Sequence, residues 1–346
     1  MRFLVVMAAA LAAACSALTS DERPKYSNPV LDHDFPDPAV LRAPDGAFYA
    51  YATQSSLGER LLNIQVARSR NLVQWEIVGD ALPQKPRWAQ KRQGFWAPHV
   101  IYDEPQRKYF MYYTQLQDEG PGKCMGVAVA QSPAGPFVDS GTPLACGRGD
   151  EYIDPMAFDD PKTGRRLLYW GGGARPIQVR ELAADRLGFA PGSAATDLVF
   201  PDPSKAYRAR LVEGAWLTYR DDVYYLFYSG DTCCGLNPRY AVMVARAASP
   251  FGPFEHYAGG TDSAIVQASG FWNAPGHNAV IRDDSGTDWM LYHAYDAART
   301  HFVDRPRLNR PGARVLLLDR IVYRDGWPRV DGDQPSAAKR PAPVLR

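Results

Sequence analysis

Residues 223–228 read Val-Tyr-Tyr-Leu-Phe-Tyr, a run of β-branched and aromatic side chains that is typical of a buried β-strand. Comparable runs recur along the chain. The five runs occupy residues 48–51, 109–113, 167–170, 223–228 and 289–292. Because they begin at residues 48, 109, 167, 223 and 289, each lies about 60 residues after the one before. The chain is therefore divided into five near-equal units.

A second strand signature follows several of these runs, at residues 66–69, 129–132 and 244–247. A unit of this size can form one four-stranded blade, and blades arranged in a ring bury their faces against each other. The sequence therefore predicts an all-β fold, a single five-bladed β-propeller over residues 25–335. A β-sandwich with a second domain is the alternative. Residues 336–346 are predicted to form a loose C-terminal tail.

Composition and charge exclude some classes of protein. The chain has 346 residues with 39 Lys and Arg against 38 Asp and Glu, so its net charge is +1. A nucleic-acid partner bound through bulk charge is therefore excluded. The hydrophobic content of 46% is that of a globular chain, and 29 glycines with 29 prolines favour short strands joined by turns over a helical bundle.

The N-terminus is predicted to be a signal peptide over residues 1–20. Arg2 precedes an apolar run at residues 3–14 that is too short to span a membrane and ends at Cys15. The residues before Cys15 resemble a bacterial lipoprotein signal, so plain secretion and lipidation at Cys15 are both open. The protein is predicted to be exported, either secreted, periplasmic or anchored in the outer membrane, with membrane contact through a lipid anchor alone.

Four further cysteines remain, Cys124, Cys146, Cys233 and Cys234. An even number in an exported protein favours disulfides. Cys124 and Cys146 are candidates for a local bridge. The adjacent pair can bond to each other, or each can bond elsewhere. No Cys-x-x-Cys spacing occurs, so a structural zinc site is not predicted.

Five polar residues lie upstream of the aromatic runs with the same period as the blades. They are Asp37, His99, Asp154, Glu213 and His277. The innermost strands of a propeller converge on its axis, so these residues are expected to meet. Two carboxyl groups facing a sugar can hydrolyse a glycosidic bond, one donating a proton and one activating water, and a third can raise the pKa of the acid.

The same positions carry a family resemblance. The motifs are Phe-Pro-Asp-Pro-Ala-Val at 35–40, Trp-Ala-Pro at 96–98, Ile-Asp-Pro-Met-Ala-Phe at 153–158, Glu-Gly-Ala-Trp at 213–216 and Gly-His-Asn-Ala-Val at 276–280. They resemble, in the expected order, those of glycoside hydrolase family 43, which comprises arabinanases, α-L-arabinofuranosidases and β-xylosidases. The resemblance covers about residues 25–335 and implies a five-bladed propeller and an inverting mechanism.

The resemblance also implies a role for each acid. Asp37 is the general base that activates water, Glu213 is the general acid, and Asp154 tunes the pKa of Glu213 and holds it in position. Inversion requires room for a water, so the carboxyls of Asp37 and Glu213 are predicted to lie about 6.5–9.5 Å apart. Asp34 is the rival for the base; its other interpretation is a loop acid on the rim.

The two histidines among these five residues, His277 and His99, have different interpretations. His277 resembles the family histidine that faces the axis and, in many members, helps to hold a hydrated calcium ion. Because calcium prefers oxygen ligands, such a Ca²⁺ site would consist mostly of water. The alternative for His277 is a hydrogen-bonded histidine near the acid. His99 replaces an acidic residue that often follows Trp-Ala-Pro in relatives, and no catalytic role is assigned to it.

Three more residues are candidates for contact with the substrate. Phe35 and Trp96 can pack against a sugar face, because aromatic rings cover the apolar C–H surface of carbohydrates, although either can instead belong to the core. Arg314 resembles a family arginine that reaches the substrate, with a surface ion pair as the competing interpretation.

These features together predict an exported, monomeric, inverting glycosidase that acts on plant cell-wall polysaccharides or oligosaccharides. Release of α-L-arabinofuranosyl units from arabinan or arabinoxylan is favoured, because the Gly-His-Asn motif and the paired cysteines resemble those of arabinan-active relatives. A β-xylosidase is the first alternative, and a non-catalytic carbohydrate-binding propeller the second. A serine-hydrolase propeller is disfavoured because no Gly-x-Ser-x-Gly elbow occurs.

Overall fold

The structure is a computed structural model that describes residues 23–235, 237–259, 263–299 and 312–346. The predicted signal peptide and Cys15 lie outside these residues. Within them the chain forms β-strands and two short 3-10 turns, η1 (Ala206–Arg208) and η3 (Ala297–Arg299), with no α-helix. No described helix is long and apolar enough to cross a membrane. The all-β prediction is confirmed.

Five antiparallel sheets, one for each sequence unit, form the blades. Blade I is β2 (Ala39–Arg42), β3 (Phe48–Ala52), β6 (Gln65–Ser69) and β7 (Glu76–Asp80). Blade II is β8 (Phe95–Asp103), β9 (Lys108–Leu116), β10 (Lys123–Ala130) and β11 (Val138–Asp139), with β12 (Ala145–Cys146) also on β10. Blade III is β13 (Met156–Asp159), β14 (Arg166–Trp170), β15 (Ile177–Glu181) and β16 (Thr196–Val199).

The last two blades follow the same order. Blade IV is β17 (Val212–Arg220), β18 (Val223–Gly230), β19 (Ala241–Ala247) and β20 (Glu255–His256), with β21 (Ala264–Val266) also on β19. Blade V is β22 (Trp272–Arg282), β23 (Asp288–Asp296), β24 (Arg314–Arg324) and β25 (Trp327–Val330). A separate hairpin joins β4 (Ser55–Leu57) to β5 (Arg60–Leu62).

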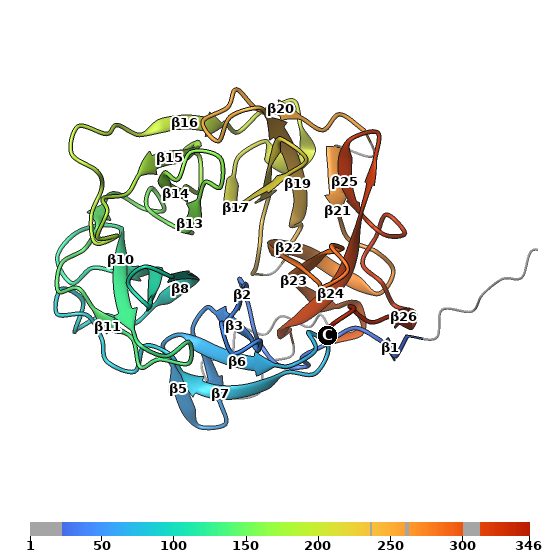
Figure 1. Ribbon diagram of the computed structural model, residues 1–346, viewed down its shortest axis with the longest axis horizontal. Helices are drawn as coiled ribbons and strands as arrows, with labels where there is room; N and C mark the ends of the chain where they lie inside the picture. Colours follow the sequence, from blue (N-terminus) through green and yellow to red (C-terminus); the bar gives the residue numbers. More distant parts are fainter. Residues whose placement is uncertain (1–22, 236, 260–262, 300–311) are drawn as a thin grey trace, which may run out of the picture.

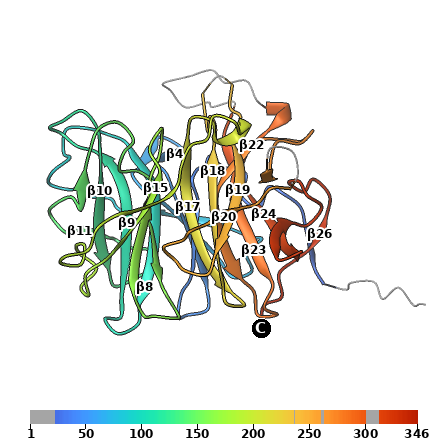
Figure 2. The same ribbon diagram turned by 90° about the horizontal axis from the view of Figure 1, so that it is seen from above.

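The innermost strands close a ring. β2 contacts β8, β8 contacts β13, β13 contacts β17, β17 contacts β22, and β22 contacts β2. Figure 1 shows these five strands around the centre of the molecule, and Figure 2 shows the long strands of the blades running through its thickness. The five-bladed propeller is therefore confirmed, and the first strand of each blade lines the axis as predicted.

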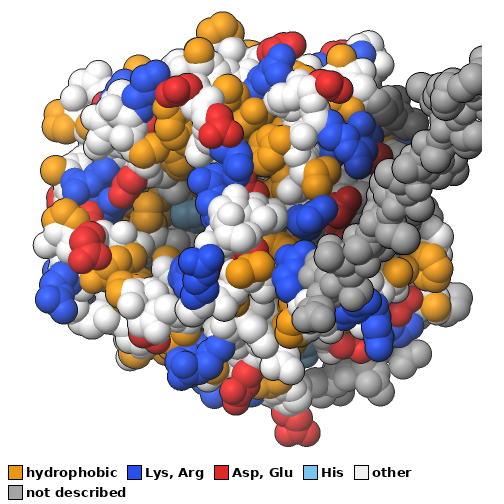
Figure 3. Space-filling view, turned by 45° about the vertical axis from the view of Figure 1, so that its right-hand side comes forward, with side chains coloured by type: hydrophobic (Ala, Val, Ile, Leu, Met, Phe, Trp, Pro, Cys, Tyr) orange, Lys and Arg blue, Asp and Glu red, His pale blue; other side chains and the backbone are white. Residues whose placement is uncertain are grey.

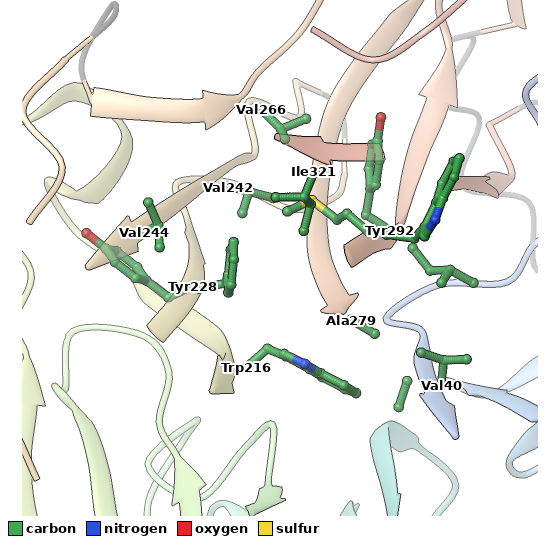
Figure 4. Packing of buried hydrophobic residues seen from close by; sticks show 14 of the residues in the cluster. Val40, Trp216, Tyr228, Val242, Val244, Val266, Ala279, Tyr292 and Ile321 are labelled. Carbon is green, nitrogen blue, oxygen red and sulfur yellow. The ribbon is translucent and has the colours of Figure 1, made fainter. Parts of the chain in front are cut away.

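Each aromatic run forms the second strand of its blade. β3 is buried at every residue, and all residues of β18 after Val223 are buried. Both faces of such a strand are covered because each blade packs against its two neighbours. The largest buried cluster joins blades IV and V with parts of blades I and III, and Figure 4 shows Trp216 and Tyr228 of blade IV in this cluster with Val40 of blade I.

The C-terminal tail is not loose, which corrects the prediction for residues 336–346. β26 (Arg340–Pro341) pairs with β1 (Lys25–Tyr26) and ties the two ends of the chain together. Ser336 is buried, and its backbone N–H donates to Asp319 of blade V at 3.2 Å. The tail is ordered because buried carboxylates of blade V accept hydrogen bonds from its backbone, a partnership that composition does not reveal.

Both candidate disulfides are present, Cys124–Cys146 and Cys233–Cys234. The first joins β10 to β12 in one blade, and the second lies in the loop between β18 and β19. On the face drawn in Figure 3, acidic and basic side chains are interspersed. This distribution agrees with the balanced charge of the sequence.

Candidate active site

The innermost strands are irregular at the positions that face the axis. Asp37, Asp154 and His277 have positive φ angles of 55°, 56° and 49°. Regular pairing is interrupted in β17 after Glu213 and in β22 on both sides of Gly276. Such bulges and left-handed residues redirect side chains away from the alternating pattern of a strand and are common next to functional sites. The local backbone therefore turns these polar groups toward the centre of the ring.

Asp37 is buried among groups that stabilise its charge. Its Oδ1 accepts a hydrogen bond from Arg314 Nη1 at 3.0 Å, and its Oδ2 accepts one from the Thr53 hydroxyl at 2.6 Å. Burial alone would raise the pKa of Asp37, but Arg314, His277 and His293 together with the Thr53 hydrogen bond hold it well below its usual range. Asp37 is therefore an ionised carboxylate that can accept a proton.

Glu213 and Asp154, in contrast to Asp37, lie in surroundings that favour the protonated carboxyl. Burial, reinforced by Asp37, raises the pKa of Glu213 to about 7, although a hydrogen bond from the Tyr240 hydroxyl to Glu213 Oε1 at 2.8 Å lowers it in part. Burial and the neighbouring Glu213 raise the pKa of Asp154 well above its usual range. Asp154 Oδ2 also accepts the backbone N–H of Gly214, next to Glu213, at 3.0 Å. Glu213 therefore holds a proton in mildly acidic solution.

His277 lies between two of the acids. Its Nδ1 is 3.7 Å from Asp37 Oδ1 and 3.6 Å from Asp154 Oδ2. Burial lowers its pKa, while Asp37 opposes that effect. Asp37 and Asp154 therefore both approach the same nitrogen of one imidazole. These contacts agree with the interpretation of His277 as a histidine beside the acids.

Two functional residues were missed by the sequence analysis, Tyr240 and His293. Tyr240 donates to Glu213 and stacks on His293, with ring centroids 5.8 Å apart and an interplanar angle of 9°. His293 is fully buried, and its Nδ1 accepts the backbone N–H of Asp37 at 3.0 Å. A signal for His293 was available, because it is the one histidine in the aromatic strand β23. Tyr240 carries no such signal.

The position of Tyr240 depends on a glycine in another strand. A Cβ atom added to Gly276 would lie 2.0 Å from Tyr240 Cδ1, closer than two carbon atoms can approach. Gly276 therefore makes room for the ring that donates to Glu213. This contact explains the glycine of the Gly-His-Asn motif in physical terms.

Arg314 and Trp96 both lie at the site. Arg314 has its side chain 14% exposed and pairs with Asp37, so the surface ion-pair interpretation is wrong. Trp96 is half-buried, and the ammonium group of Lys123 lies 4.5 Å from the centroid of its ring. Lys123 also lowers the pKa values of Asp154 and Glu213 by its charge. One face of Trp96 is therefore occupied by the Lys123 ammonium group, whose charge also acts on Asp154 and Glu213.

The remaining candidates have structural roles. Phe35 is fully buried in the main hydrophobic cluster, so the prediction that it packs against a sugar is wrong: the strand entry turns its ring into the core. Asp34 accepts hydrogen bonds from the Ser55 hydroxyl at 2.6 Å and the Arg314 backbone N–H at 3.1 Å, as a loop acid. His99 accepts the Ala157 N–H at 3.3 Å, and burial lowers its pKa to about 3.

The calcium prediction can be compared with the donors near His277. Among the described residues, no group of three or more His, Cys, Asp or Glu side chains is arranged to hold a metal ion. Both amide atoms of Asn278 are buried without a protein hydrogen-bond partner. One imidazole and one amide do not form a calcium shell, which needs six to eight oxygen ligands. The protein residues alone do not fit the ion, and no chemical step is derived through it.

The geometry defines a class of protein. An ionised carboxylate and a protonated one, with a third acid beside them on the axis of a β-propeller, are the groups that hydrolyse a glycosidic bond. Residues 26–328 match the model of the glycosyl hydrolases family 43. The chain belongs to this family and is a glycoside hydrolase, as the motifs predicted.

Individual relatives agree with this assignment. The chain is 27% identical to an extracellular endo-α-(1→5)-L-arabinanase of Thermotoga petrophila, over 94% of this chain and 75% of the relative. It is 30% identical to the β-D-galactofuranosidase xynD of Aspergillus niger, over 89% of this chain and 85% of the relative. The crystal structure of a thermostable family-43 glycoside hydrolase superposes with a TM-score of 0.73 at 26% identity, covering 93% of this chain and all of that one.

Proposed function

We propose that this protein is an exported, inverting glycosidase that releases α-L-arabinofuranosyl units from plant arabinan or arabinoxylan. The observation that carries the catalytic part is the unequal surroundings of two buried acids: Asp37 accepts hydrogen bonds from Arg314 and Thr53, which lower its pKa, whereas burial raises the pKa of Glu213 to about 7. Binding alone does not require such a matched pair, which argues against a non-catalytic propeller.

In the proposed mechanism, Asp37 accepts a proton from a water molecule that attacks the anomeric carbon. Glu213 donates its proton to the oxygen of the leaving group, and the water enters from the opposite face of the sugar, which inverts the anomeric configuration. Burial and the negative charge of Asp37 keep Glu213 protonated, and Asp154 supports its position by accepting a hydrogen bond from the Gly214 backbone N–H. Arg314 and Thr53 keep Asp37 ionised and fixed in place.

The sugar preference is supported by the names of the relatives. One is named for α-(1→5)-L-arabinan, whose rings must be furanoses because O5 is used in the linkage, and another is named for β-D-galactofuranosides. A furanoside substrate is therefore favoured over a xylopyranoside. Relatives named extracellular, together with the N-terminal signal pattern, support export. Lipidation at Cys15, a monomeric state and a hydrated calcium ion near His277 stay predictions.

Activity measurements test the proposal directly. Wild type, Asp37→Ala and Glu213→Ala are compared on 4-nitrophenyl α-L-arabinofuranoside, β-D-galactofuranoside and β-D-xylopyranoside. We expect the arabinofuranoside to be the best substrate and both variants to lose activity. NMR of the first product formed from an arabinofuranoside should show the inverted anomer. A retained anomer, full activity in either variant, or a preference for the xyloside would contradict the corresponding part of the proposal.

A further inference from the structure

The loop between β18 and β19 begins and ends beside Glu213. Glu213 pairs with Ser229 of β18, and the next residue, Gly230, pairs with Ala241 at the start of β19. Tyr240, immediately before Ala241, returns to donate its hydroxyl to Glu213 at 2.8 Å. The described residues of this loop, 231–235 and 237–240, therefore begin next to the strand partner of Glu213 and end at the tyrosine that donates a hydrogen bond to it.

A disulfide between adjacent residues, Cys233–Cys234, lies within this loop. Cys233 is half-buried and packs against the small apolar cluster formed by Tyr240, Ala274 and Tyr295, whereas Cys234 is exposed. The Arg239 backbone N–H donates to the Thr232 carbonyl at 2.8 Å and closes the loop around the pair. Among the described residues of the loop other than Tyr240, Cys233 is thus the one that packs against this cluster.

Outside this cluster, the described loop is held by Arg239, which lies 5.4 Å from the centroid of the Tyr207 ring and 3.6 Å from Asp231. Thr232, Gly235, Asn237 and Arg239 are exposed. A segment with few buried apolar contacts opens easily unless it is otherwise restrained. The ring of Tyr240 is held on one side by His293 and depends on Gly276 for space, but its backbone is held in place by this loop. The vicinal pair restricts the Cys233–Cys234 peptide, and Cys233 in turn packs against the cluster that contains Tyr240.

We propose that the Cys233–Cys234 disulfide is a positioning element for the general acid, which fixes the loop so that Tyr240 holds the Glu213 carboxyl in register with the leaving group. This inference rests on the proposed function, because it assigns Glu213 as the acid. Neither sulfur atom needs to touch the substrate. The benefit is preorganisation, since a rigid loop does not have to be ordered again in each catalytic cycle.

Reduction of the Cys233–Cys234 disulfide removes this restraint on the loop. A dithiol such as dithiothreitol breaks the S–S bond, two electrons and two protons pass to the two sulfur atoms, and the reagent is oxidised to its own cyclic disulfide. The Cys233–Cys234 peptide then regains its conformational freedom. The loop is expected to hold Tyr240 less firmly, and Glu213 is expected to donate its proton less efficiently.

The test compares two substrates that differ in their need for an acid. A linear α-1,5-arabino-oligosaccharide has a poor leaving group, whereas 2,4-dinitrophenyl α-L-arabinofuranoside has one that departs without protonation. In the double variant Cys233→Ala/Cys234→Ala we expect kcat to fall about tenfold on the oligosaccharide and less than about twofold on the aryl substrate, because displacement of an acid affects the step that it assists. KM should change by less than about twofold.

The second disulfide provides the matched control. The variant Cys124→Ala/Cys146→Ala should keep the wild-type ratio of kcat values on the two substrates. In the variant Cys124→Ala/Cys146→Ala, dithiothreitol can reduce only the Cys233–Cys234 bond, and it should lower kcat on the oligosaccharide but not on the aryl substrate. Reoxidation should restore kcat, which a misfolded protein would not do. Equal loss on both substrates, a change in KM alone, or insensitivity to dithiothreitol would overturn the proposal. If the wild type cleaves neither furanoside, the proposed function fails first and this inference with it.

Discussion

Replacing Arg314 by methionine tests how the structure sets the ionisation of the base. Arg314 Nη1 lies 3.0 Å from Asp37 Oδ1, and both side chains are largely buried. Two unit charges about 4 Å apart interact by about 4 kcal/mol at an effective dielectric constant of about 20. Since 1.36 kcal/mol corresponds to about one pH unit, removal of this charge could raise the pKa of Asp37 by about 3. Partial solvent access and relaxation reduce this value, so we expect a rise of about 1 to 3.

The sign of the effect on activity follows from the role of the base. As the proposed base, Asp37 must be ionised, so kcat/KM is expected to be lost as the pH falls through its pKa. A raised pKa therefore moves the acidic limb of the pH profile upward. In Arg314→Met this limb should move up by about 1 to 3 pH units. The measurement is kcat/KM on an aryl arabinofuranoside from pH 3 to pH 9 (about the range in which carboxyls titrate).

Thr53→Val is the matched control, because it removes a single neutral hydrogen bond from the same carboxylate. It should move the limb in the same direction but by less, since a neutral donor stabilises a charge less than a guanidinium does. If Arg314→Met lowers activity uniformly and leaves the acidic limb where it is in the wild type, Arg314 acts on the substrate and not on the ionisation of Asp37.

Three further predictions concern the acid, its support and the ends of the chain. The basic limb of kcat/KM should lie near pH 7, where Glu213 loses its proton. The variant Glu213→Gln should lower kcat on arabino-oligosaccharides by about 100-fold or more. If the basic limb persists in this variant, it belongs to another group. The variant Gly276→Ala should lower the free energy of unfolding, measured in urea, by about 1–3 kcal/mol and should lower kcat, because the added methyl group overlaps Tyr240. Unchanged stability would show that the tyrosine ring can move. Deletion of residues 337–346 should lower the melting temperature by about 2–4 °C for each kcal/mol lost with the β1–β26 pairing, and an unchanged value would mean that the tail contributes nothing.

Much of the fold was predictable because it repeats. The aromatic runs mark the second strand of each blade, and a strand that is covered on both faces must be apolar throughout. The acids were predictable for a related reason, because they share the period of the blades. Asp37 and Asp154 lie two residues before β2 and β13, Glu213 lies in β17, and these three innermost strands meet at one axis.

Other parts of the site follow no period. Tyr240 enters from a loop, and His293 enters from a second strand, where it lies among aromatic core residues. Phe35 neighbours the base in sequence but faces the core, because the left-handed backbone at Asp37 separates the directions of the two side chains. The tail has the composition of a flexible segment but is held by buried carboxylates of blade V.

The sequence by itself determined the number of blades, their succession along the chain and the three acids, because periodic burial leaves a periodic pattern of residue types. Tertiary structure alone decided which acid is ionised and which is protonated. Asp37, Asp154 and Glu213 are all buried carboxyls, and what distinguishes them is the surroundings that the fold supplies: a guanidinium from blade V acts on the first, whereas burial and nearby negative charge dominate for the other two. Charge at a buried site depends on distances between residues far apart in the chain, and only the closed ring sets those distances.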